Sequence, residues 1–343
     1  MADGTKIEWT DATWNVVNGC SVVSPGCTNC YAMRLAGTRM RHHPSRAGLT
    51  RDTKAGPVWN GEVRFNDKVL LDPLRWRRPR RIFVCAHGDL FHEAVPDEWI
   101  DRVFAVMALA PQHVFQVLTK RPERMRAYFT HDGGFGRWGF IEQQARKLAK
   151  VPDHRTLATF GGSNLPHVWL GVSIEDQARA DERIPLLLAT PAAVRWLSCE
   201  PLLGPVDLAK LRPDGINFTL DALTGRGEHL LGYRGQTGKI DWVVAGGESG
   251  PGARPMHPAW ARSLRDQCAA AGVPFLFKQW GEWLPDPEAD ALGDEIDGAP
   301  FLIWHADSWR NLPQDHIGDY TFRIGKKRAG RLLDGQLHDG FPA

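Results

Sequence analysis

Short apolar runs recur along the chain, and they constrain the fold more than any other feature of the sequence. Each run is rich in Val, Ile, Phe or Trp and ends in a cluster of small or polar residues. Runs of this kind, bounded by turn residues, are typical of buried parallel strands. The predicted strands cover residues 13–17, 81–85, 113–118, 167–170, 194–197 and 241–245, with a further candidate at 274–277.

Helical stretches separate several of these predicted strands. One begins at Asp97, directly after Pro96, and others are expected at 138–150, 175–188 and 258–271. Alternation of strand and helix at this spacing indicates βα units around a parallel sheet. We therefore expect an α/β fold in which the units close, fully or partly, into a TIM-like barrel.

Two segments interrupt this rhythm. Residues 207–240 are rich in Gly and Asp and predict an inserted loop or hairpin. Residues 284–343 are mixed, include the basic stretch 323–328, and predict a C-terminal appendage that covers the barrel mouth or binds a partner. We therefore expect a barrel domain over residues 1–283, with an insertion at about 207–240, followed by the appendage.

The composition is that of an ordinary globular protein. The 343 residues include 42 Lys or Arg and 40 Asp or Glu, so net charge neither favours nor excludes a nucleic-acid partner. The start of the chain lacks a basic and apolar leader, and no stretch approaches the roughly 20 apolar residues of a membrane span. We expect a cytoplasmic protein with no membrane partner, in which thiols stay reduced.

Three cysteines lie close together directly after the first predicted strand. Cys20, Cys27 and Cys30 form a C-x6-C-x2-C pattern. In a reducing compartment such a group more often binds a metal than forms disulfides, and thiolates suit zinc or iron–sulfur clusters. Three protein ligands leave one position open, which favours a cluster with one iron free for chemistry. The alternative is zinc, with His42 or His43 as the fourth ligand.

The other three cysteines are far apart in the sequence. Cys85, Cys199 and Cys268 are first interpreted as buried small apolar side chains. Cys199 differs because it lies beside Glu200 at the end of a predicted strand, where it could donate a hydrogen atom to a radical.

Polar and charged residues also follow most of the predicted strands. Barrel enzymes build their active sites at the C-terminal ends of the strands, so these residues predict one active face. The alternative is that they are turn residues without a chemical role. The stretches concerned are 87–89, 119–121, 173–175, 199–201 and 246–250.

A three-cysteine loop after the first strand of a partial (β/α)6 barrel resembles the radical S-adenosylmethionine (SAM) superfamily. The first interval here is three residues longer than the usual C-x3-C-x2-C motif of that superfamily, and Asn29 stands where an aromatic residue is common. The chain more closely resembles a phage- and prophage-associated three-Cys-motif family of unknown function, and it is distantly similar to spore photoproduct lyase. The matching pieces are 14–31, 88–92, 118–122, 171–173, 199–202, 246–250, 325–327 and 333–335.

This resemblance implies an enzyme. The three cysteines would hold a [4Fe–4S] cluster, and SAM would chelate its open iron. An electron donor would supply one electron, which cleaves SAM to a 5′-deoxyadenosyl radical that abstracts hydrogen from the substrate. The protein would position these groups and exclude side reactions.

The resemblance also implies roles for residues in the middle of the chain. Asp89 would accept a hydrogen bond from the methionine ammonium of SAM, and Lys120 or Arg121 would pair with its carboxylate. Ser173 and Glu175 would bond the ribose hydroxyls.

Four residues further along the chain would complete the site. Gly246 and Gly247 would allow the backbone to approach the cofactor closely. Glu200 and Glu248 would face either SAM or the substrate, and we group them with Cys199 as candidate catalytic residues.

Arginine-rich segments suggest the substrate class. Residues 75–81 place five arginines around Trp76, and four more arginines lie within 39–51. Arginine and aromatic side chains suit phosphate contacts and base stacking, so we expect nucleic acid or a nucleotide as substrate. The alternative for these segments is a solvated surface loop.

Two other functions remain open from the sequence. One is a zinc-stabilised nucleic-acid-binding protein without catalysis. The other is a barrel hydrolase that uses Asp89, Glu200 and Glu248 as acid and base.

Overall fold

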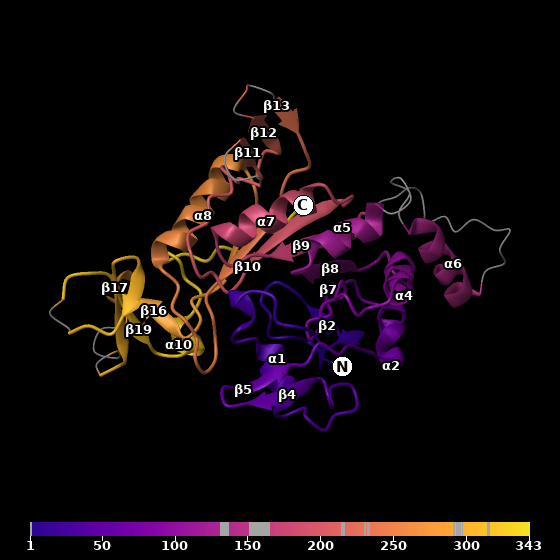
Figure 1. The fold of residues 1–343 in the computed structure, drawn as a ribbon, viewed down its shortest axis with the longest axis horizontal. Coiled ribbons are helices and arrows are strands. Elements are labelled where there is room, and N and C mark those ends of the chain that lie inside the picture. Colours follow the sequence, from indigo (N-terminus) through magenta and orange to yellow (C-terminus); the bar gives the residue numbers. More distant parts are fainter. Residues whose placement is uncertain are drawn as a thin grey trace. The chain divides into compact units, whose positions relative to one another are not determined.

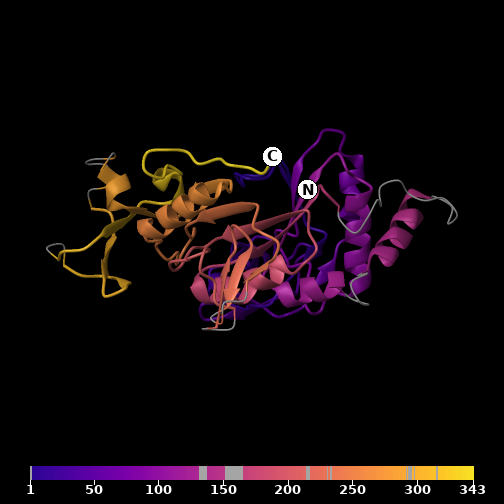
Figure 2. The same cartoon turned by 90° about the horizontal axis from the view of Figure 1, so that it is seen from above.

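The computed structural model describes residues 2–130, 137–150, 165–213, 217–229, 231, 234–290, 292, 296, 298–313 and 316–343. Parts of the predicted insertion and of the predicted appendage therefore lie outside the described residues. Figure 1 shows a mixed α/β structure, and Figure 2 shows it turned by 90°. No helix among the described residues is long and apolar enough to cross a membrane.

The main sheet of the described residues has the strand order β1-β2-β7-β8-β9-β10-β14-β15. The short β1 pairs antiparallel with β2, whereas β2, β7, β8 and β9 pair in parallel, as do β14 and β15. The strands are β1 (Ala2–Asp3), β2 (Ala12–Trp14), β7 (Arg81–Val84), β8 (Val114–Thr119), β9 (Val168–Ser173), β10 (Val194–Cys199), β14 (Trp242–Gly246) and β15 (Phe275–Gln279).

Helices connect the parallel strands. Helix α4 (Asp97–Ala108) joins β7 to β8, α5 (Pro122–Thr130) and α6 (Trp138–Ala149) join β8 to β9, α7 (Gln177–Leu188) joins β9 to β10, and α8 (Pro258–Ala271) joins β14 to β15. From β2 onward the spatial order follows the chain order without a reversal, unlike the order of a doubly wound sheet. The predicted α/β fold is confirmed, and this order is consistent with a partial barrel.

The described chain forms two compact units. The first comprises Met1–Ser173, Glu182–Trp196 and Thr237–Lys239, and the second comprises Ile174–Asp181, Leu197–Gln236 and Ile240–Ala343. Strand β10 is divided between them, with residues 194–196 in the first unit and 197–199 in the second.

The first unit has a core of large apolar side chains on the sheet. Trp9, Trp14, Phe115 and Trp196 are almost fully buried, and Trp9 packs edge-on against Trp196 with ring centroids 5.2 Å apart. Helices α4 and α6 lie side by side in Figures 1 and 2. Shorter elements complete this unit: β3 (Val17–Asn18), β6 (Arg64–Phe65), α2 (Asp67–Leu70) and α3 (Asp72–Arg75).

A small apolar cluster supports the cysteine loop in this unit. Helix α1 (Tyr31–Gly37) packs against a hairpin of β4 (Thr50–Thr53) and β5 (Gly56–Trp59). Met33, Leu49 and Trp59 are buried together there, and Cys20 and Cys30 pack against the cluster. Packing therefore fixes the backbone that carries these two cysteines.

The second unit adds two antiparallel sheets to its parallel strands. Strands β11 (Phe218–Asp221), β12 (Arg226–His229) and β13 (Arg234–Gln236) form one sheet within the predicted insertion. The other sheet lies within the region predicted as the appendage and has the order β16-β19-β17-β18. Its elements are β16 (Trp283–Pro285), α9 (Asp286–Ala289), β17 (Phe301–His305), β18 (Ser308–Arg310), β19 (Tyr320–Arg323) and α10 (Lys326–Ala329).

Several strand ends differ from the predicted ones, including those of β2 and β10, and for β9 the physical reason is clear. Strand β9 continues to Ser173, whereas the sequence predicted an end at residue 170. Gly171 was interpreted as a turn residue, but it lies in the strand beneath the indole of Trp196. A Cβ atom there would come within 2.5 Å of the indole Nε1, so close packing and not a turn requires this glycine.

Candidate functional site

A tight loop brings the three cysteines onto a compact piece of backbone. Cys20 follows β3, Cys27 ends the 3-10 helix η1 (Pro25–Cys27), and Cys30 immediately precedes α1. The amide of Cys27 donates to the carbonyl of Ser24 at 2.9 Å, and that of Cys30 donates to the carbonyl of Cys27 at 3.3 Å. All three are free thiols and are partly exposed.

The three thiols also influence one another electrostatically. Burial is the largest cause that raises the pKa of Cys20 to about 12, and the charge of Asp89 adds to it. The charges of Cys30 and Cys27 raise this pKa further, whereas that of Arg121 lowers it. The sulfurs are therefore close enough to interact, and one positive charge opposes their mutual repulsion.

Among the described residues, no three or more His, Cys, Asp or Glu side chains gather where they could hold one metal ion. The predicted zinc ligand His43 instead contacts Ser45 at the exposed surface.

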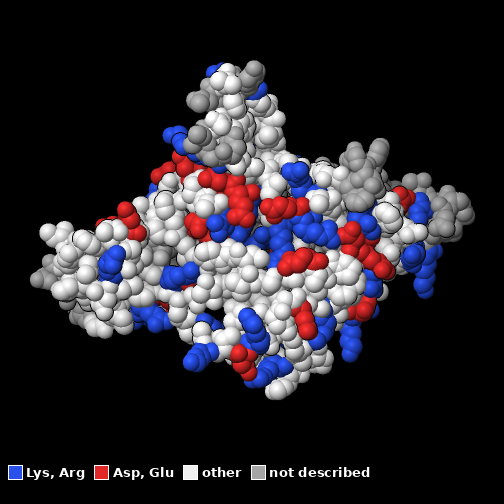
Figure 3. All heavy atoms as spheres, viewed as in Figure 1, with Lys and Arg blue, Asp and Glu red and all other residues white. Residues whose placement is uncertain are grey.

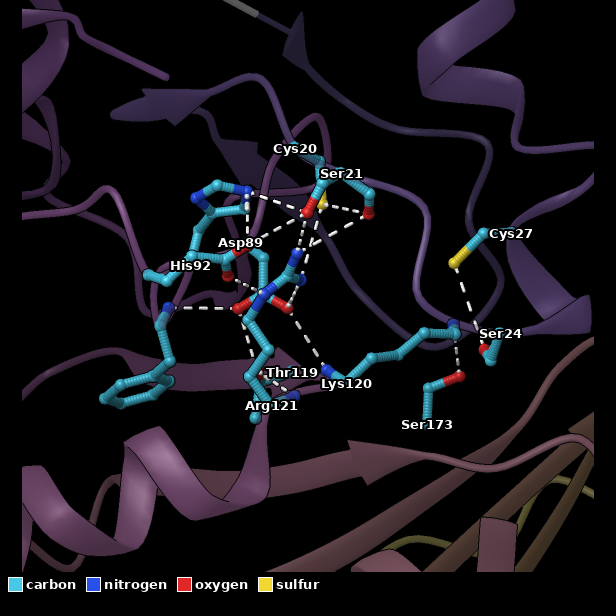
Figure 4. A network of polar contacts seen from close by, with 12 residues as sticks. Cys20, Ser21, Ser24, Cys27, Asp89, His92, Thr119, Lys120, Arg121 and Ser173 are labelled. Atoms are coloured by element: carbon cyan, nitrogen blue, oxygen red, sulfur yellow. Dashed lines mark hydrogen bonds and ion pairs between the residues drawn. The ribbon is translucent and has the colours of Figure 1, made fainter. Parts of the chain in front are cut away.

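Arg121 connects the cysteine loop to the ends of two strands, as Figure 4 shows. It is buried directly after β8, and one terminal nitrogen lies 3.6 Å from the Cys20 Sγ and 3.0 Å from Asp89 Oδ2. The other terminal nitrogen donates to the Ser21 hydroxyl at 2.6 Å, and Nε donates to Glu93 at 2.7 Å. Burial lowers the pKa of Arg121, but the charges of Asp89, Cys20 and Glu93 outweigh it and raise that pKa.

Asp89 is fully engaged by the protein. Its Oδ1 accepts from the Thr119 hydroxyl at 2.7 Å and the Phe91 amide at 3.0 Å. Its Oδ2 accepts from the Lys120 amide at 3.1 Å and from Arg121. A carboxylate offers about four acceptor positions, so these four bonds occupy them. Asp89 therefore holds the end of β8 and Arg121 in place.

Lys120 and Ser173 face each other at the ends of β8 and β9. The Lys120 ammonium donates to the Ser173 hydroxyl at 2.8 Å. An ammonium group has three N–H donors. Among the described residues no other acceptor contacts this group, so it retains donors for a ligand.

Close backbone approach brings the end of β7 beside the cysteine loop. Gly19 and Gly88 form a parallel bridge, and a Cβ atom on Gly88 would come within 2.8 Å of the Val17 carbonyl oxygen. Cys85, which directly follows this strand, adopts a positive φ of 57°. Strained backbone of this kind often occurs at functional sites.

The carboxylates predicted further along the chain lie in the second unit. Glu248 is buried, and its two oxygens accept from Arg254 at 2.6 and 2.9 Å. Glu200 pairs with Lys278 at 3.0 Å. Both carboxylates are therefore neutralised by basic partners within their own unit.

The remaining predicted residues of the second unit are closely packed. A Cβ atom on Gly247 would come within 1.9 Å of the Trp280 carbonyl oxygen, and one on Gly246 within 2.8 Å of a Glu200 oxygen. Cys199 and Glu175 are fully buried. Packing alone thus accounts for the two glycines.

The structure therefore brings together, in the first unit, the predicted residues Cys20, Asp89, Lys120, Arg121 and Ser173. Sequence reasoning assigned no individual role to their partners Ser21, His92, Glu93 and Thr119, although Thr119 lies in the predicted active-face stretch 119–121. His92 Nε2 lies 3.0 Å from the Ser21 hydroxyl, and Glu93 bonds Arg121. Ser21 and Glu93 could have been found only by their adjacency in sequence to Cys20 and to the stretch 88–92.

Comparison with known proteins gives one match. A family model described as "Protein of unknown function (DUF5131)" matches residues 4–342. No curated protein and no protein of solved structure matches the chain.

Proposed function

The chain belongs to the family described as "Protein of unknown function (DUF5131)", and we propose that it is an iron–sulfur enzyme of the radical SAM type. Cys20, Cys27 and Cys30 would hold a [4Fe–4S] cluster at the mouth of a partial barrel, with SAM at the open iron. When bound and reduced, this pair supplies a 5′-deoxyadenosyl radical that removes hydrogen from an organic substrate.

The contact between Arg121 and Cys20 carries this proposal. Three thiolates place three negative charges in one loop, and the buried guanidinium lies 3.6 Å from one of the sulfurs. A neighbouring positive charge favours the thiolate, which is the form that binds metal. A cysteine group with only a structural role in an apolar core would not need this charge.

The bonds of Asp89 and Lys120 suggest separate roles for them. Asp89, whose acceptor positions are all occupied, would orient Arg121 and the end of β8 instead of binding the SAM ammonium. Lys120 bonds only Ser173 within the described segments and so keeps N–H donors for a ligand, which suits the predicted pairing with the SAM carboxylate.

Product formation tests this function. Protein purified and reconstituted without oxygen should contain iron and acid-labile sulfide. With dithionite in place of the natural electron donor, it should convert SAM to 5′-deoxyadenosine. Cys27→Ala should abolish both properties, whereas Cys268→Ala, which removes a buried cysteine of the second unit, should retain them. A colourless protein with stoichiometric zinc would contradict the proposal.

Nucleic-acid binding stabilised by zinc is a second candidate, supported by one segment. Arg77 and Arg78 are exposed just before β7, and Arg80 lies 5.0 Å from the Trp76 ring centroid. This segment lies at the opposite end of β7 from Asp89, so it would contact a partner away from the cysteines. On the face drawn in Figure 3, positive side chains are interspersed with negative ones. Salt-dependent DNA binding that needs no SAM would favour this candidate.

The hydrolase candidate receives less support. A general acid or base must exchange a proton with the substrate. Asp89 and Glu248 are each paired with an arginine, and Glu200 is paired with a lysine.

A further inference from the structure

Arg46 is a buried cation with no carboxylate partner among the described residues. Only 5% of its surface is exposed. One terminal nitrogen donates to the hydroxyl and carbonyl of Ser45, and the other lies 2.5 Å from His87 Nδ1. Burial lowers the pKa of Arg46 to about 10, and only Tyr31 and Cys85 oppose this shift. Arg121, by contrast, has two carboxylate partners.

The contact with Arg46 fixes the tautomer of His87. A guanidinium can only donate, so Nδ1 of His87 accepts and its proton lies on Nε2. Burial, followed by the charge of Arg46, lowers the pKa of His87 to about 4, so the ring is neutral at pH 7. His87 therefore presents an Nε2–H donor.

In the part of the chain that the structure describes, two N–H donors of this pair lack an acceptor. Neither Nε of Arg46 nor Nε2 of His87 has a hydrogen-bond partner among the described residues. Neither is among the described fully buried polar atoms that lack a partner, and the His87 side chain is partly exposed. A charged donor and a neutral donor therefore lie next to each other without an acceptor from the described segments.

This pair lies beside the cysteine loop. The Gly19 amide, one residue before Cys20, donates to the His87 carbonyl at 3.1 Å. Tyr31 follows Cys30, its hydroxyl donates to the Ala86 carbonyl at 2.9 Å, and its ring lies edge-on to His87 at 5.8 Å. An anion held by the pair would therefore lie next to the candidate cluster.

We propose that Arg46 and His87 form an oxyanion site that holds a phosphate group of the substrate. The positive charge has no counter-ion among the described residues, and an anion would offset the free-energy cost of burying it. The two donors come from different side chains, which suits the tetrahedral oxygens of phosphate better than the planar pair of a carboxylate. Assigning the phosphate to the substrate rests on the proposed function, whereas the anion site itself does not.

Thermal unfolding of the full-length protein tests the site, with inorganic phosphate as the probe. A ligand that binds only the folded state raises the unfolding temperature as its concentration increases. Phosphate should raise this temperature beyond chloride at matched ionic strength. Arg46→Met should weaken the apparent phosphate affinity at least tenfold, and Arg46→Lys should weaken it less. Arg41→Gln, which removes an exposed arginine paired with Asp52, should leave it unchanged.

Two results would overturn the site: no phosphate-specific shift in the wild type, or an equal shift in Arg46→Met. Circular dichroism establishes that each variant is folded. Adenosine monophosphate and a short single-stranded oligonucleotide then distinguish a free nucleotide from a polymer as the source of the phosphate. Phosphate binding is measured without SAM, so its failure leaves the cluster proposal standing, and failure of the cluster leaves this site standing.

Discussion

Two buried arginines of the first unit differ in how their charge is balanced. Arg121 contacts Asp89, Glu93 and Cys20, and its pKa is raised. Arg46 contacts only neutral groups in the described part of the chain, and its pKa is lowered. The first arrangement suits a permanent support for the cysteine loop, and the second suits a site that an incoming anion completes.

Replacing Arg121 tests its supporting role. Arg121→Gln leaves the buried carboxylate of Asp89 without its cation, which typically costs about 3 kcal/mol or more of unfolding free energy. It also removes the charge that favours the Cys20 thiolate, so iron content after anaerobic reconstitution should fall. Urea unfolding and iron analysis measure the two effects. Arg124→Gln, which removes a half-buried arginine paired with Asp97, is the control. Unchanged stability and iron content in Arg121→Gln would contradict this role.

His87 predicts a pH dependence of stability. Its pKa falls from 6.5 to about 4 on folding, so the unfolded chain binds a proton at a higher pH than the folded protein. The unfolding free energy should therefore decrease as pH falls from 6.5 towards 4. Protonation of His87 in the unfolded chain should account for about 1–2 kcal/mol of the loss at pH 5. Urea unfolding at pH 7 and pH 5 measures this change.

The matched variants are His87→Gln and His42→Gln, the second of which alters an exposed histidine of the neighbouring loop. Only His87→Gln should reduce the difference in unfolding free energy between pH 7 and pH 5. If the unfolding free energy changed with pH equally in wild type and His87→Gln, other groups would be the cause.

At the scale of elements, prediction succeeded where local signals were strong. Helix α8 has the predicted bounds because Pro258 stands at its first position and Gly272 ends it with a positive φ of 67°. The hairpin of β4 and β5 was not predicted, because its exposed Thr, Arg and Asp residues carry no apolar pattern. The length of β9 depended on Gly171 and Trp196, which are far apart in the sequence.

Gly171→Ala tests that packing. The added methyl group would overlap the Trp196 indole, and overpacking of this kind costs about 1–3 kcal/mol. Gly235→Ala is the control, since a Cβ atom there meets nothing within 4 Å. Urea unfolding should show a clear loss for the first variant and little change for the second. A loss of equal size in both would contradict the explanation for the extended strand.

At the scale of the whole molecule, strand order could be predicted but the assembly of the site could not. The apolar runs and their spacing indicated the parallel strands, and the polar residues after them marked where a site would form. The contact between Arg121 and Cys20 joins residues 101 positions apart, and that between Arg46 and His87 joins residues 41 apart. Such pairings depend on tertiary packing, which periodicity does not reveal.

The division into two units also bears on the predicted site. The cysteine loop, the Arg121 network and the pair Arg46–His87 all belong to the first unit. The candidate catalytic residues Cys199, Glu200 and Glu248 belong to the second unit, together with the basic partners of the two carboxylates. The cluster proposal therefore rests on the first unit alone.

Electron paramagnetic resonance of the reduced, anaerobically reconstituted protein, recorded with and without SAM, tests the central claim most directly. A [4Fe–4S] cluster with an open iron predicts a signal that changes in shape when SAM is added, and that is absent in Cys27→Ala. A signal unaffected by SAM would contradict binding at an open iron. The absence of any cluster signal, with zinc in the protein instead, would contradict the iron–sulfur centre itself.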